Sequence, residues 1–268
     1  MECRRPLAHA TSGMGEGWGE GCRLFGILSF PRLPDGTHAR NMTRNRVRPL
    51  PRLHDVTAVI FDLDGVLVDS EPMHFRAANR VLARWGAAIS EPEYRASIGL
   101  GEAATWESWR QRLGLSGTFE EWSTANTQAR LHEIAAGVSP IVEAVQLARQ
   151  LHAAGMALAI ASSSTRAVID ALLAALAVDD LFTVRVSGED PAVGASKPAP
   201  DVYRVAAAHL HVPPSTCLAI EDSAPGVTAA KRAGMTCVAV PNRWTADQDF
   251  RDADIVLESL QYFPLLVL

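Results

Sequence analysis

Several residue types and patterns are scarce in this chain of 268 residues, and each shortage excludes a class of protein. The four cysteines include no Cys-x-x-Cys pair, so we expect neither a zinc site nor a disulfide framework. No stretch approaches the roughly 18 consecutive apolar residues of a membrane span. The net charge of −5 argues against a general nucleic-acid binder. We therefore expect a soluble cytoplasmic protein with free thiols and with no nucleic-acid or membrane partner.

The charge is distributed unevenly along the chain. Residues 1–54 contain nine arginines, no lysine and four acidic residues, so they carry +5 and residues 55–268 carry −10. The first part also contains seven of the 19 glycines and shows a period of neither 2 nor 3.6 residues. These features predict a disordered N-terminal extension over residues 1–54, followed by an acidic folded region.

From residue 56 onward, short apolar runs alternate with longer segments of helical periodicity. The runs lie at 56–61, 157–161, 184–187, 218–220, 238–240 and 255–257. They are apolar without alternation, which is typical of parallel strands covered on both faces. The repetition predicts a doubly wound parallel α/β sheet built from residues 55–70 and 138–268. Ser139 and Pro140 predict the N-cap and first turn of the helix before the second run.

One long segment, residues 71–137, interrupts this alternation. It shows helical periodicity near 72–85, 102–113 and 119–136, with no strand-like run in between. The segment is far longer than an ordinary crossover connection. We expect a small helical cap domain, inserted over the carboxyl edge of the sheet where open α/β sheets bind ligands.

Two acidic pairs occur at the ends of apolar runs. Asp62 and Asp64 follow the first run, and Glu221 and Asp222 follow the fourth. Carboxylates held close together at buried strand ends disfavour each other's ionised form. A hard dication that takes oxygen ligands, such as Mg²⁺, is the expected neutralising partner.

Two further motifs complement these acids. Ser162, Ser163 and Ser164 follow the second run, where they suit either anion binding or an ordinary helix N-cap. Lys197 lies in a proline-rich turn. The chain contains only two lysines beside 23 arginines, so a lysine here indicates a functional point charge. The alternative, a solvated surface residue, stays open. Carboxylates, a hydroxyl and an ammonium at the ends of separate strands suit phosphoryl transfer through an aspartyl intermediate.

In their order and spacing, these motifs resemble the haloacid dehalogenase superfamily, and within it the β-phosphoglucomutase-like phosphatases with a helical cap. The resemblance covers about residues 55–242 and implies a Rossmann-like core of the haloacid dehalogenase type. It implies that Asp62 is the nucleophile, which forms a phosphoaspartate. Asp64 would be the general acid and then the base. Ser162 and Lys197 would hold the phosphoryl oxygens.

The resemblance also implies a Mg²⁺ site and a substrate class. The Asp62 carboxylate, the Asp64 backbone carbonyl and Asp222 would bind the ion, with Glu221 coordinating it or lying directly behind its ligands. The implied substrate is a small phosphorylated metabolite, such as a sugar phosphate. For the oligomeric state, a monomer or weak homodimer is our default expectation. The further implied substrate contacts are Glu71, His74, Ser163 and Ser164.

Two alternatives to a phosphatase stay open. The first is a sugar-phosphate mutase of the β-phosphoglucomutase type, since His74 is similar to that enzyme's hinge histidine. Against it, Glu102 takes the place of an arginine in the mutase-like loop, and residues 71–137 contain no lysine to hold a second phosphate. The second alternative is a phospho-ligand-binding module without turnover, which the four intact motifs disfavour.

Overall fold

The computed structural model describes residues 55–266, with side chains to residue 263, and these residues fall within one compact unit. The prediction for residues 1–54 lies outside the described residues. Six strands form one sheet in the order β3-β2-β1-β4-β5-β6, and every neighbouring pair is parallel. The doubly wound parallel sheet is thus confirmed. The strands are β1 (Ala58–Phe61), β2 (Ala157–Ser162), β3 (Val184–Ser187), β4 (Cys217–Glu221), β5 (Thr236–Ala239) and β6 (Ile255–Val256).

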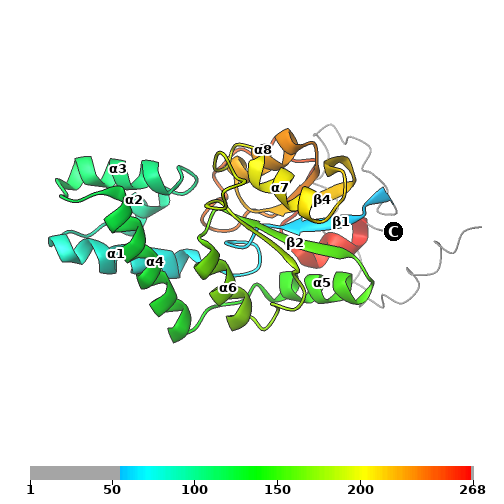
Figure 1. Ribbon diagram of the computed structural model, residues 1–268, viewed down its shortest axis with the longest axis horizontal. Coiled ribbons are helices and arrows are strands. Elements are labelled where there is room, and N and C mark those ends of the chain that lie inside the picture. Colours follow the sequence, from blue (N-terminus) through cyan, green and yellow to red (C-terminus); the bar gives the residue numbers. More distant parts are fainter. Residues whose placement is uncertain (1–54, 267–268) are drawn as a thin grey trace, which may run out of the picture. The chain divides into compact units, whose positions relative to one another are not determined.

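Helices cover both faces of the sheet, which explains why its strands are apolar throughout. Along β1, Val59 and Phe61 belong to the core on one face, and Ala58 and Ile60 belong to the core on the other. Helices α5 and α6 pack on the first face, and α7 and α8 pack on the second (Figure 1). Their bounds are α5 (Val142–Ala153), α6 (Arg166–Ala175), α7 (Asp201–His209) and α8 (Ala224–Ala233), with short 3-10 helices η4 (Pro214–Thr216) and η5 (Leu260–Leu266).

Helix α5 begins later than the sequence predicts, so the assignment of Ser139 and Pro140 to its N-terminus is wrong. The helix starts at Val142, after Ile141 at the N-cap. The carbonyl of Ser139 instead accepts a hydrogen bond from Asp69 N at 2.9 Å, and Pro140 bridges to Val68. Pairing with the turn after β1 has therefore overridden a local helix-start signal.

Between β1 and α5 the chain forms four α-helices and one 3-10 helix, and these gather at the side where the strands end (Figure 1). We call the segment they form, residues 71–136, the cap; its standing as a separate domain stays a prediction. The cap contains α1 (Glu71–Leu82), the 3-10 helix η3 (Ala83–Trp85), α2 (Glu91–Arg95), α3 (Glu102–Leu113) and α4 (Phe119–Ala136). The short α2 is absent from the sequence prediction, because five residues are too few to show a helical period.

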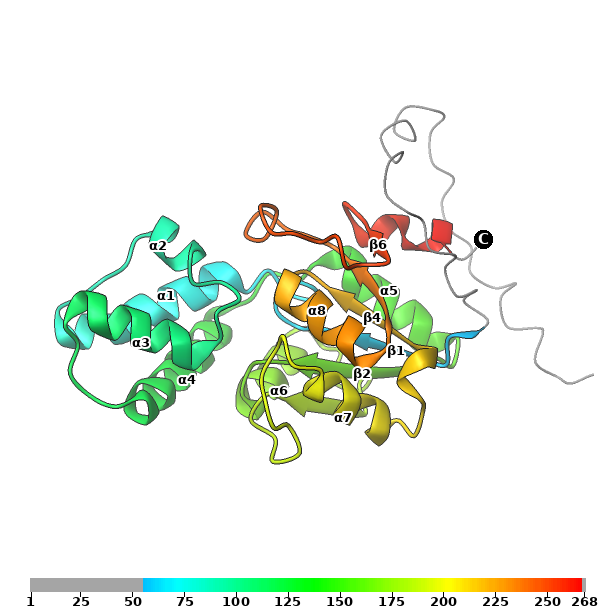
Figure 2. The ribbon, with the colours of Figure 1, turned by 90° about the horizontal axis from the view of Figure 1, so that it is seen from above.

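The cap has an aromatic core of its own. Trp106 and Trp122 stack with ring centroids 5.4 Å apart, and Trp109 meets Trp122 edge-on at 6.1 Å. Trp244 joins this core from the loop between β5 and β6, which reaches toward the cap (Figure 2). Its ring lies edge-on to Tyr94 with the centroids 6.1 Å apart.

Cys217 and Cys237 are buried free thiols on β4 and β5. Burial raises the pKa of both thiols, which keeps them protonated and unreactive. Among residues 55–266, no helix combines the length and the apolar character needed to cross a bilayer.

Candidate active site

The site forms where the strand order reverses. From β1 the sheet grows through β2 to one side and through β4 to the other, and open α/β sheets bind ligands at such a switch point. Asp62 directly follows β1, and its backbone N–H donates to Ile220 O on β4 at 2.9 Å. Asp222 directly follows β4. The parallel pairing of these two strands therefore brings two distant carboxylates to one point.

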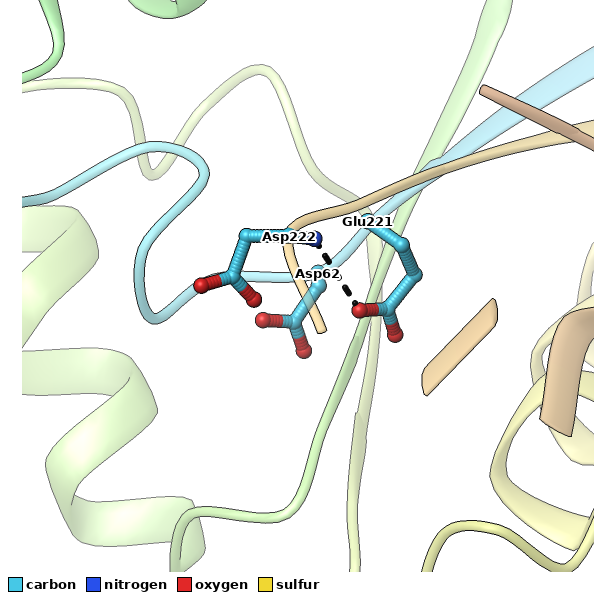
Figure 3. Close-up of side chains that lie close together, drawn as sticks. All are labelled: Asp62, Glu221 and Asp222. Atoms are coloured by element: carbon cyan, nitrogen blue, oxygen red, sulfur yellow. Dashed lines mark hydrogen bonds between the residues drawn. The ribbon is translucent and has the colours of Figure 1, made fainter. Parts of the chain in front are cut away.

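Three buried carboxylates converge at this point: those of Asp62, Glu221 and Asp222 (Figure 3). Oxygen atoms of all three lie within 4.8 Å of one another. Burial raises the pKa of Asp62 to about 8; Lys197 opposes the rise, and Glu221 and Asp64 add to it. Burial, reinforced by Asp62 and Glu221, also raises the pKa of Asp222 well above its ordinary value. The cluster thus holds more negative charge than its surroundings compensate.

Lys197 supplies the positive charge inside the cluster. Its Nζ donates to Asp62 Oδ1 at 2.6 Å, to Glu221 Oε1 at 2.7 Å and to the Ala161 carbonyl at 2.9 Å. The side chain is only 8% exposed. Burial lowers the pKa of Lys197, but the two carboxylates outweigh it and raise the pKa above its usual range. The ammonium is therefore fixed beside Asp62.

Glu221 is fully buried behind Lys197 and does not line the cavity described below. Its Oε1 accepts from Lys197 and, at 2.6 Å, from the Tyr203 hydroxyl. Its Oε2 accepts from Asp222 N at 3.2 Å and from Ser223 Oγ at 3.3 Å. With both oxygens engaged, Glu221 acts as the counter-ion of Lys197. Sequence reasoning missed Tyr203, whose position in α7 carries no local sign of this contact.

The absence of a side chain at Gly226, in the first turn of α8, makes room for Glu221. A Cβ at this position would lie 2.0 Å from the Glu221 carboxylate. In an exposed helix, glycine to alanine stabilises by up to about 1 kcal/mol. Here we expect Gly226→Ala to lower the free energy of unfolding by about 1–3 kcal/mol, because it overpacks a buried charge.

Urea unfolding measures the effect of Gly226→Ala, with Thr228→Ala in the same helix as the control. Glu221→Asp combined with Gly226→Ala should recover part of the loss, because the shorter acid vacates the space. An increase in stability on Gly226→Ala alone would contradict the overpacking.

Asn242, from the loop after β5, fixes the orientation of Asp222 and was missed by sequence reasoning. Its Nδ2 donates to Asp222 Oδ2 at 2.7 Å, and its Oδ1 accepts from Trp244 N at 2.8 Å. Gly65 has a φ of +75°, and a Cβ there would lie 2.2 Å from Asp222 Oδ2. The position of Asn242 just beyond the fifth apolar run was the available signal, since strand ends in such sheets carry site residues.

Asp64 points away from the cluster toward α1 and the serines. Its Oδ1 lies 2.7 Å from His74 Nε2, and its Oδ2 accepts from Ser164 Oγ at 2.8 Å. Ser162 Oγ lies farther from Oδ2, at 3.4 Å, and accepts from Ser164 N at 3.0 Å. Burial raises the pKa of Asp64, but His74 and Ser164 outweigh it and hold that pKa below its usual range. Asp64 is therefore an anion in this arrangement.

A cavity of about 220 Å³ joins these groups to the cap. Nine of the ten site residues predicted from the sequence line it, and Glu221 is the exception. The nine are Asp62, Asp64, Glu71, His74, Ser162, Ser163, Ser164, Lys197 and Asp222. On the cap side, burial raises the pKa of Glu71, which accepts a hydrogen bond from the Tyr94 hydroxyl at 2.5 Å.

Two more cavity residues that sequence reasoning missed lie on α4. Asn126 and Arg130 are spaced i,i+4, so they share a face of the helix, and both line the cavity. Asn126 Nδ2 donates to Glu102 Oε1 at 3.0 Å, and Arg130 Nη1 lies 3.3 Å from the same oxygen. The cap therefore places one guanidinium at the cavity, although it contains no lysine.

Comparison with known proteins gives consistent matches. Residues 59–240 match the family model of haloacid dehalogenase-like hydrolases. The chain is 36% identical over 211 residues to protein CbbY of Rhodobacter capsulatus, covering 75% of this chain and 92% of that protein. It is 34% identical over 211 residues to hexitol phosphatase B of Escherichia coli K12, covering 76% of this chain and 93% of that protein.

Solved structures of CbbY from Rhodobacter sphaeroides also match the chain. One is a complex with phosphate, and another is a variant in complex with xylulose-(1,5)bisphosphate. Each has a TM-score of 0.71 and 29% sequence identity, covering 77% of this chain and 95% of the other.

Proposed function

The chain belongs to the haloacid dehalogenase-like hydrolases and is a phosphomonoester hydrolase, and from this premise we propose that it hydrolyses small phosphorylated metabolites by way of a phosphoaspartate on Asp62, with Mg²⁺ as its cofactor. One observation carries the proposal. The Asp62 carboxylate lies between the Lys197 ammonium and Asp222, in the same cavity as Asp64 and Ser162. A nucleophile, a cation to stabilise charge and an acid–base group are thereby available to one phosphate.

The donor set fits Mg²⁺. Raised pKa values of buried carboxylates indicate that positive charge is missing around them, and a hard dication with oxygen ligands would supply it. We assign the ion to the carboxylates of Asp62 and Asp222 and to the Asp64 backbone carbonyl. Glu221 is left to Lys197, because both of its oxygens already accept hydrogen bonds. Bound there, Mg²⁺ would neutralise these carboxylates and offset the charge of the phosphoryl oxygens.

The residues then act in two steps. A carboxylate oxygen of Asp62 attacks phosphorus, and the bond from phosphorus to the leaving oxygen breaks as Asp64 gives that oxygen a proton. Asp64 next takes a proton from water, whose oxygen attacks phosphorus and releases the Asp62 carboxylate with inorganic phosphate. Lys197 and Ser162 hold the phosphoryl oxygens throughout.

Asp64 must gain a proton before the first step, although His74 and Ser164 hold its pKa below the usual range. A bound phosphate dianion would raise the pKa of Asp64, because like charges disfavour each other's ionised form. His74, at 2.7 Å, lies within reach to pass the proton. Substrate binding thus raises the pKa of Asp64, which is the direction that a general acid requires.

The proposed function predicts Mg²⁺-dependent release of inorganic phosphate. We expect turnover of p-nitrophenyl phosphate and of hexitol or sugar phosphates, with loss of activity in EDTA and recovery on adding Mg²⁺. Phosphate release, measured colorimetrically, tests this directly. Conversion of β-glucose 1-phosphate to glucose 6-phosphate without phosphate release would favour the mutase instead. Saturable ligand binding with neither reaction would favour the binding module.

A further inference from the structure

We propose that Glu102 makes the protein select its substrate by charge. The cavity takes monophosphates whose remaining part is neutral and polyhydroxylated, and it disfavours compounds with a second phosphate. This inference rests on the proposed function, because it concerns the cap side of the same cavity. In the proposed function, the core side of the cavity, with Lys197 and Ser162, binds the phosphate that is cleaved. The cap side must therefore recognise the rest of the substrate.

The cap side has no uncompensated cation. Among the described residues that line the cavity, Arg130 is the only arginine or lysine from the cap, whereas the cap contributes two carboxylates, Glu71 and Glu102. Tyr94, Ser97, Thr105 and Asn126 are the neutral hydroxyl and amide residues that the cap adds, and His74 from α1 is engaged with Asp64 Oδ1 at 2.7 Å. A second phosphate would find no free positive charge on this side.

Glu102 already engages the charge of Arg130. Its Oε1 lies 3.3 Å from Arg130 Nη1 and accepts from Asn126 Nδ2 at 3.0 Å, while its Oε2 accepts from Ser123 Oγ at 3.2 Å. The side chains of Arg130 and Glu102 are only 17% and 24% exposed, so solvent screens the pair less than at the surface. A second phosphate near Arg130 would meet the Glu102 carboxylate at close range, and like charges at that range oppose binding.

The same face offers hydrogen bonds suited to hydroxyl groups. Tyr94, Ser97, Thr105 and Asn126 line this side with hydroxyl and amide groups, which donate and accept hydrogen bonds. A hydroxyl of the substrate also donates and accepts, so a polyol can pair with several of these groups without carrying a charge. The cavity, at about 220 Å³, is below the ~300–1,000 Å³ of drug-sized pockets, which favours a small metabolite.

Two matched substrate pairs test the inference: fructose 6-phosphate with fructose 1,6-bisphosphate, and ribose 5-phosphate with ribose 1,5-bisphosphate. We expect the wild-type kcat/KM to favour each monophosphate by about tenfold or more. Glu102→Gln keeps the shape and acceptor of the side chain but removes its charge. That variant should reduce the preference by about tenfold, since each 1.4 kcal/mol of lost repulsion is a factor of ten.

Two further variants show that the change comes from the released guanidinium. Glu102→Gln combined with Arg130→Gln should not gain bisphosphate activity, because no cation is freed. Glu107→Gln removes an exposed carboxylate from the same helix and should leave the preference unchanged. A preference that Glu102→Gln does not alter would overturn the role of Glu102.

The remaining outcomes separate this inference from the proposed function. Equal or better wild-type turnover of the bisphosphates would overturn the inference alone. Hydrolysis of p-nitrophenyl phosphate without hydrolysis of any sugar phosphate would also overturn it, while leaving a phosphatase. No phosphate release from any compound, p-nitrophenyl phosphate included, would overturn the proposed function and this inference with it.

Discussion

Asp62→Asn should abolish phosphate release, with kcat falling on the order of 10⁴-fold or more, as expected when a nucleophile is removed. The asparagine amide is a poor nucleophile and cannot form the acyl phosphate. The variant keeps the size of the side chain at a position that is only 6% exposed. Single-turnover measurement of inorganic phosphate, with Mg²⁺ present, is the appropriate assay.

The fold of Asp62→Asn should be at least as stable as that of the wild type without Mg²⁺. The substitution removes a carboxylate whose pKa burial raises to about 8, and with it the repulsion on Asp222. Thermal unfolding in EDTA tests this, and Asp249→Asn on the surface is the control for loss of a single charge. Retained turnover in a correctly folded Asp62→Asn protein would refute the phosphoaspartate route.

Lys197→Met should cost on the order of 10²–10³-fold in kcat/KM, the range typical of losing one fixed electrostatic contact to the reacting group. It should also destabilise the protein by about 3–5 kcal/mol, because the Glu221 carboxylate would lose its ionic partner while fully buried. Lys231→Met is the matched control, since it removes the other lysine, which pairs with Asp254 outside the site.

The pH dependence of Lys197→Met separates an electrostatic role from a structural one. Lys197 lowers the pKa of Asp62, so its loss should move the acid limb of the kcat/KM profile to higher pH. The pH dependence of stability follows from proton binding by Asp62. Because its pKa is raised to about 8 in the folded state, Asp62 binds more protons in the native state than in the unfolded state. The free energy of unfolding without Mg²⁺ therefore falls as the pH rises from about 4 toward 8. An unshifted acid limb would count against the electrostatic role.

Much of the fold and of the candidate site could be predicted because both follow from local patterns. Apolar runs without alternation mark buried parallel strands, and the carboxyl ends of such strands meet at one edge. Asp62, Lys197 and Asp222 could therefore be assigned to one place although they are far apart in the sequence. Their roles in catalysis stay proposals.

The residues that escaped prediction depend on tertiary contacts. Tyr203 reaches Glu221 only because α7 packs over β1 and β2, and nothing in its own neighbourhood indicates the contact. The choice between metal ligand and counter-ion for Glu221 likewise depends on which donors surround it. The position of Arg130 at the cavity could not be predicted, because the absence of lysine from the cap does not indicate which helix face an arginine occupies.

The loop after β5 connects the carboxylate cluster to the cap. Asn242 holds Asp222, and Trp244, two residues later, is embedded in the aromatic core of the cap. Two residues of extended chain span at most about 7 Å. A cap movement that would place Trp244 more than this distance from Asn242 must also pull Asn242 away from Asp222. The loop is therefore a short tether, and it couples the position of the cap to the orientation of Asp222 in the carboxylate cluster.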